Sequence, residues 1–133
     1  MSRLRLTLAG VLVALVTVVS ASAAGAPPTL VGTVGPGYTT LVGTVGPGFT
    51  IALTRDGKKV TTLKAGKYLL VAADLSAIHN FVLEQESGGK LEKDLTKVPF
   101  IGTNVYSITL AKGTYKYYCK PHEATMHGSF TVS

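Results

Sequence analysis

The sequence predicts an all-β protein, an antiparallel Greek-key β-sandwich of about seven to eight strands. Short segments of alternating apolar and polar residues recur from Phe49 to the end of the chain, and turns that contain glycine separate them. No segment keeps a helical period over a useful length. The chain has no tryptophan, so tyrosine and phenylalanine are expected to supply the large core side chains.

The first 23 residues have the pattern of a secretory signal peptide. Arg3 and Arg5 precede an apolar run over residues 6–19, and the small residues ASA follow at 21–23. The apolar run is too short for a comfortable membrane span. We therefore predict a signal peptide over residues 1–23 and a periplasmic or secreted protein, with no membrane span after the signal is removed.

A tandem duplication follows the predicted signal. The segment TLVGTVGPGYT (29–39) is repeated as TLVGTVGPGFT (40–50), and the copies differ only at Tyr38 and Phe49. Because the second copy runs directly into the next predicted strand, we expect it to form the first strand of the domain. The domain is therefore predicted to span residues 40–133. Residues 24–39 form an N-terminal extension, either an additional edge strand or a loose arm.

The remaining strands are predicted from alternation and turn residues. A hairpin is expected over residues 49–63 around Asp56-Gly57, and a long connection with a short helical turn is expected over 87–103. His79, Phe81 and Leu83 have the same parity, so His79 should point inward at one end of a strand. The other predicted strands span residues 66–74, 79–86, 104–110, 113–119 and 128–132.

Charge and cysteine content exclude several classes of protein. The predicted signal carries two of the thirteen Lys and Arg residues, so removing it lowers the formal net charge from +6 to +4. The lysines are scattered, and we expect no nucleic-acid partner. Cys119 is the only cysteine, which excludes a disulfide within the chain.

Four side chains with soft or borderline donor atoms could meet at one end of the sandwich. Cys119, His122 and Met126 lie in the loop between the last two predicted strands, and His79 begins an earlier strand. Two imidazoles, a thiolate and a weak thioether are the ligand set of blue copper, because they suit both Cu(II) and Cu(I). We predict one copper ion held by these four residues.

Other interpretations explain these four residues less completely. Taken alone, Cys119 would be a buried structural thiol. Zinc could use one cysteine and two histidines but gains little from a thioether. A cysteine nucleophile would need a base and an orienting group, and the sequence offers no recognisable substrate cleft. We therefore expect a protein that is not an enzyme.

The motifs IHNF (78–81) and YYCKPHEATMHGSFTV (117–132) resemble the cupredoxins, specifically small bacterial plastocyanin/azurin-type blue (type 1) copper proteins. The resemblance covers roughly residues 40–133. It implies a Greek-key sandwich that binds one copper ion and shuttles single electrons. It also implies that Asn80 helps to hold the cysteine loop. Plastocyanin has one more residue between its second histidine and its methionine, so this loop is shorter.

The resemblance also implies partners and a contact surface. Larger redox proteins would exchange electrons with a monomer through the edge of His122. Pro99, Phe100 and Pro121 are the expected apolar surroundings of this edge, and Tyr118 offers a second route. The alternative function is a copper-binding module that delivers or sequesters copper outside the cytoplasm.

Overall fold

A computed structural model describes residues 38–133. The predicted signal peptide and all but the last two residues of the predicted N-terminal extension lie outside these residues. Within the described part of the chain, no helix has both the length and the apolar character needed to cross a membrane.

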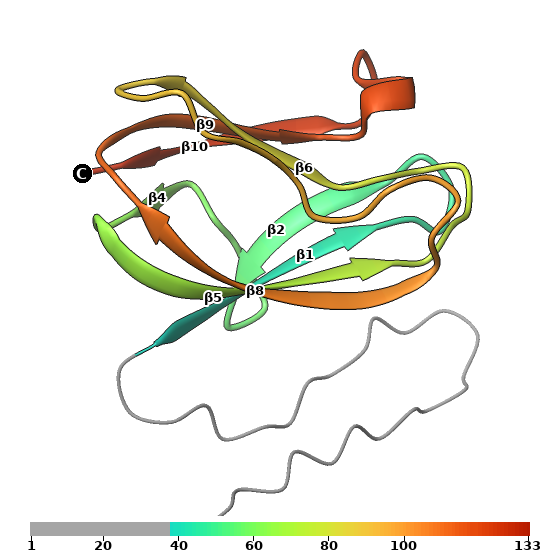
Figure 1. The fold of residues 1–133 in the computed structure, drawn as a ribbon, viewed down its shortest axis with the longest axis horizontal. Coiled ribbons are helices and arrows are strands. Elements are labelled where there is room, and N and C mark those ends of the chain that lie inside the picture. Colours follow the sequence, from blue (N-terminus) through green and yellow to red (C-terminus); the bar gives the residue numbers. More distant parts are fainter. Residues whose placement is uncertain (1–37) are drawn as a thin grey trace, which may run out of the picture.

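Within residues 38–133, ten strands form two five-stranded sheets that lie one above the other (Figure 1). In spatial order, the first sheet contains β3 (Lys58–Lys59), β2 (Ile51–Arg55), β1 (Thr39–Val45), β5 (Gly66–Asp74) and β8 (Gly102–Leu110). The second sheet contains β4 (Thr62–Leu63), β10 (His127–Val132), β9 (Gly113–Tyr118), β6 (Val82–Ser87) and β7 (Glu92–Asp94).

The predicted β-sandwich is confirmed, but the predicted strand count is too low. The difference comes from β3, β4 and β7, which have only two or three residues each. The Asp56-Gly57 hairpin forms as expected, with positive φ at both turn residues. Beyond it the predicted second strand divides, because β3 stays beside β2 whereas β4 crosses to β10. In the segment predicted as a connection, β7 adds an edge strand beside β6.

Two strand pairings are parallel, which the prediction of an antiparallel sandwich did not include. β1 runs parallel to β5, and β10 runs parallel to β4. The predicted helical turn also has a different place. The short 3₁₀ helix η1 (Lys120–His122) lies between β9 and β10, not in the segment before β8.

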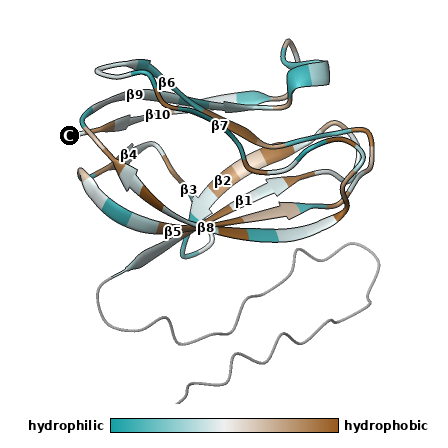
Figure 2. Ribbon diagram, in the orientation of Figure 1, coloured by the Kyte–Doolittle hydropathy of each residue, from teal (hydrophilic) through white to brown (hydrophobic). Residues whose placement is uncertain are grey.

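Residues 40–45, from the second copy of the duplicated segment, form β1 together with Thr39. β1 is a central strand between β2 and β5, and it buries Leu41 and Val45 in the core. Hydrophobic residues occur on the strands of both layers (Figure 2), and their buried side chains meet in one core between the sheets. Tyr115 and Tyr117 are among the largest fully buried side chains, as expected for a chain without tryptophan.

The loops at one end of the sandwich come together because of strand register. Val45, Asp74 and Gly102 are paired across β1, β5 and β8, so the loops that follow or precede them lie at the same end. In the second sheet, Val82, Tyr118 and His127 are paired across β6, β9 and β10. The start of β6 and the β9–β10 loop therefore lie together as well.

Candidate metal centre

His79, Cys119 and His122 lie together, although forty residues separate the first two in the sequence. His79 is three residues before β6, Cys119 directly follows β9, and His122 ends η1. Nδ1 of His79 is 3.7 Å from Sγ of Cys119, and Nδ1 of His122 is 3.6 Å from the same sulfur. The two Nδ1 atoms are 3.1 Å apart. Among the described residues, these three form a group that could hold a metal ion.

The triangle of donor atoms has the size that a transition-metal ion requires. A point equidistant from the three atoms lies about 2.0 Å from each, close to the ~2.0–2.3 Å that nitrogen and sulfur ligands keep from zinc. Both imidazoles present Nδ1 to this point. Nε2 of His79 is buried and has no hydrogen-bond partner within the described chain. The donors therefore fit a small ion bound by two nitrogens and one sulfur.

The loop from Cys119 to Met126 closes on itself through backbone hydrogen bonds. The N–H of Cys119 donates to the carbonyl of Met126 at 3.0 Å, and the N–H of Met126 donates to the carbonyl of His122 at 2.9 Å. Pro121 falls at the beginning of η1, where a fixed φ favours the turn. Met126 is fully buried and belongs to the same core cluster as Cys119.

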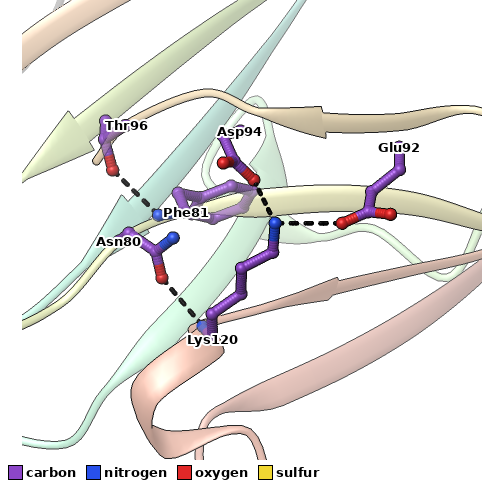
Figure 3. Close-up of polar contacts among 6 residues, drawn as sticks. All are labelled: Asn80, Phe81, Glu92, Asp94, Thr96 and Lys120. Carbon is purple, nitrogen blue, oxygen red and sulfur yellow. Dashed lines mark hydrogen bonds and ion pairs between the residues drawn. The ribbon is translucent and has the colours of Figure 1, made fainter. Parts of the chain in front are cut away.

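Asn80 ties the start of this loop to the segment that carries His79. Its side-chain oxygen accepts a hydrogen bond of 2.8 Å from the backbone N–H of Lys120 (Figure 3). The ammonium group of Lys120 also forms ion pairs with Glu92 at 3.0 Å and Asp94 at 2.8 Å. These acidic partners raise the pKa of Lys120 above its ordinary value. The residue after the cysteine is thus held by β7 and by the segment before β6.

A buried polar network lies beneath the same segment, and sequence reasoning missed it. Thr96 donates from its hydroxyl to Asp74 at 2.7 Å and accepts from the backbone N–H of Phe81 at 2.8 Å (Figure 3 shows the second bond). Asp74 also accepts from the N–H of Ser76 at 3.1 Å. Burial raises the pKa of Asp74, although both hydrogen bonds oppose that shift. The only signal in the sequence was an acidic residue at the end of an apolar strand.

The position of Phe49 beside the two histidines was not predicted from the sequence either. Its ring meets His122 edge-on, with centroids 4.9 Å apart, and lies 5.4 Å from the ring of His79. The side chain is 61% exposed, so it covers the histidines from the solvent side. Phe49 is also the position at which the duplicated segments differ, which could have drawn attention to it.

The residues predicted for a contact surface have different environments. Pro99 and Pro121 are exposed, Phe100 is half-buried, and His122 is partly exposed. Tyr118, predicted as a second route, is buried, with 6% of its surface exposed. His127, the third histidine of the chain, is exposed and lies outside the cluster, with Nδ1 2.8 Å from the carbonyl oxygen of Glu123.

A two-sheet sandwich with a Cys–His–His cluster at one end defines a cupredoxin-type metal-binding domain. Residues 51–133 match the family described as copper binding proteins, plastocyanin/azurin family. The chain belongs to this family, and its cofactor is one copper ion per chain.

A comparison with solved structures gives matches to auracyanin A and to amicyanin, both at low sequence identity. Auracyanin A, a "blue" copper protein from the green thermophilic photosynthetic bacterium Chloroflexus aurantiacus, is 20% identical with a TM-score of 0.50. The match covers 73% of this chain and all of auracyanin A. A reduced tryptophan-to-tyrosine mutant of amicyanin is 18% identical with a TM-score of 0.46, over 76% of this chain and 87% of amicyanin. A comparison with curated protein sequences gives no significant match.

Proposed function

We propose that this protein is an exported type 1 copper protein that carries single electrons between larger redox proteins. One observation carries the proposal: two imidazole Nδ1 atoms and a thiol sulfur converge with the spacing that one metal ion needs. Thiolate suits Cu(I) and imidazole suits Cu(II), so copper bound by this set can change oxidation state with little rearrangement of its ligands.

In this proposal, each ligand has a distinct role that its position supports. Cys119 would supply a thiolate, and His79 and His122 would each supply an imidazole nitrogen. Met126, which directly precedes β10 and is buried in the same core cluster as the cysteine, would add a weak thioether donor. Asn80 holds the cysteine loop in place through its bond to Lys120.

Electrons would enter and leave through the edge of His122. His79 and Cys119 are fully buried, whereas His122 is partly exposed. The loops at the same end of the sandwich expose apolar side chains, which include Phe49, Ile78, Pro99 and Pro121. An apolar surface around a partly exposed ligand allows a partner to approach closely without removing charged groups from water. We propose this surface as the contact site for the redox partners.

The proposal describes a carrier and not an enzyme. Among the described residues, His79 and Cys119 are fully buried and Phe49 packs against the ring of His122, so a substrate would have little access to an ion held there. The protein would act as a monomer outside the cytoplasm. The signal peptide predicted over residues 1–23 would direct its export.

The visible spectrum of the mature protein loaded with Cu(II) tests the site. Wild-type protein is expected to become intensely blue, and Cys119→Ser is expected to lose the colour because the thiolate–copper bond is absent. His127→Ala is the matched control, because this exposed histidine lies outside the cluster. A colourless protein that binds zinc stoichiometrically would contradict the assignment.

Redox measurements then separate an electron carrier from a copper-delivery module. A carrier is expected to give a reversible one-electron couple with copper retained in both oxidation states. A delivery module would release Cu(I) readily to an acceptor chain that binds Cu(I), and this result would favour the alternative function.

A further inference from the structure

The position of β1 imposes strict requirements on the segment that fills it. The strand is paired on both sides, with β2 and with β5, and its inward residues Leu41 and Val45 are buried. Between them, Gly43 packs against the ring of Phe81. A β-carbon on this glycine would lie 2.8 Å from that ring, so a larger residue does not fit unless the ring moves.

The ring of Phe81 has little freedom to move. It is fully buried and stacks on Tyr117, with ring centroids 5.8 Å apart. The turn after β1 adds two further requirements, because Gly46 and Gly48 have φ values of 76° and 66°, which favour glycine. A segment that replaces β1 must therefore provide apolar residues and glycines in a fixed order.

The first copy of the duplication meets every one of these requirements. Leu30, Gly32 and Val34 correspond to Leu41, Gly43 and Val45. Gly35 and Gly37 correspond to the two turn glycines. The two copies differ at one position, where Tyr38 in the first copy corresponds to Phe49 in the second. Phe49 is the residue that contacts His122 at the metal centre.

We propose that either copy can form β1 within one molecule, so that the fold has two interchangeable first strands. When residues 29–39 fill the position, Tyr38 replaces Phe49 against the rings of His79 and His122. Residues 40–50 then become part of the connection to β2. Because Phe49 is 61% exposed, a phenol ring can take its place without burying the hydroxyl group. The exchange therefore adds a hydroxyl at the edge of the metal centre.

Two differences favour the second copy as the major form. Thr39 pairs with Tyr68 at the start of β1, and in the exchanged form Pro28, which has no N–H, takes the place of Thr39. The exchanged form also has a longer connection between β1 and β2. The entropic cost of a flexible loop grows only slowly with its length, so this term is modest. The form with the first copy in the β1 position is therefore less stable than the form with the second copy, but it can still be populated.

Blocking each copy separately tests this proposal. Gly43→Val prevents the second copy from packing against Phe81, and Gly32→Val does the same to the first copy. In the mature protein, G43V is expected to lower the Tm by roughly 5–10 °C while unfolding stays cooperative, because the first copy fills the position. G32V is expected to leave the Tm unchanged.

A variant without the first copy shows whether rescue comes from the duplication. G43V in a chain that lacks residues 29–39 is expected to lose cooperative unfolding, as is the double variant G32V/G43V. If G43V is as unstable as the double variant, or if deletion adds nothing to the effect of G43V, the proposal is overturned. A large loss of stability in G32V alone, or a G43V protein that folds only as a dimer, would also overturn it.

Chemical shifts of the histidine ring protons in the Cu(I) protein identify the aromatic residue at the metal centre. In the wild-type background, Phe49→Leu is expected to shift the signals of His79 and His122, and Tyr38→Leu is expected to leave them in place. In the G43V background the two effects are expected to exchange. Signals that respond only to Phe49 in both backgrounds would overturn the proposal.

Discussion

The side-chain oxygen of Asn80 accepts a hydrogen bond of 2.8 Å from the backbone N–H of Lys120. This bond joins the residue after one proposed ligand, His79, to the residue after another, Cys119. Two segments that are distant in the sequence are thereby kept in register at the metal centre. Because Asn80 is buried, water cannot easily replace its partner.

Asn80→Ala is expected to lower the free energy of unfolding by about 1–3 kcal/mol, because the N–H of Lys120 loses its partner. The substitution is also expected to change the visible spectrum of the copper form, since the cysteine loop loses its tether. Denaturant titration and absorbance measure the two effects. The control is Asn104→Ala. This substitution also removes a hydrogen bond from a side chain to the backbone, which Asn104 donates to the carbonyl of Leu95. An equal spectral change in both variants would contradict a specific role for Asn80.

Phe49→Ala is expected to lower the reduction potential, on the order of tens of millivolts, where ~59 mV corresponds to a tenfold change in the equilibrium constant. Removing the ring lets water approach His122, and a more polar environment favours the more highly charged oxidised site. Equilibrium redox titration measures the shift. Phe49→Tyr keeps the aromatic contact and is expected to change the potential much less. A higher potential in the alanine variant would contradict this reasoning.

Met126→Leu is expected to raise the reduction potential. Leucine replaces a sulfur donor with an apolar group, and a less polar site with fewer donors favours the less highly charged Cu(I). Leucine has a similar volume, and the cost in folding stability is expected to stay below about 1.5 kcal/mol despite complete burial. Redox titration of the copper form and denaturation of the copper-free form separate the two effects. An unchanged potential would show that the sulfur of Met126 is not a ligand.

Asp74→Asn is expected to flatten the dependence of stability on pH. Burial raises the pKa of the folded-state carboxyl above its ordinary value of 3.8, so the folded state favours the protonated form. The contribution of Asp74 to stability is therefore greatest below pH 3.8 and falls as the pH rises through its folded-state pKa. Urea titrations across this range measure the slope. A slope as steep in the variant as in the wild type would contradict the assignment to Asp74.

The sandwich could be predicted because its cues are local. Alternation identified the longer strands, and Asp56-Gly57 identified a hairpin whose turn needs positive φ. The parallel pairing of β1 with β5 could not be predicted in this way, because alternation shows which face of a strand is buried and not which strand lies beside it. The two-residue strands β3 and β4 are too short to show a period.

The grouping of donor atoms could be expected from residue types, but their surroundings could not. A lone cysteine near a histidine and a methionine suggested a metal site, and the inward parity of His79 suggested a partner for them. Phe49 and Asp74 carry no such chemical signature. Their importance depends on where β1 and β5 end in space, which the local sequence does not determine.

The uneven exposure of the three donor residues has a kinetic consequence. His79 and Cys119 are fully buried, whereas His122, whose ring packs against Phe49, is partly exposed. An ion, a chelator or a small oxidant must therefore pass these two rings to reach the sulfur. The rate at which the site gains or loses its ion then depends on how often the rings separate, and not on binding strength alone.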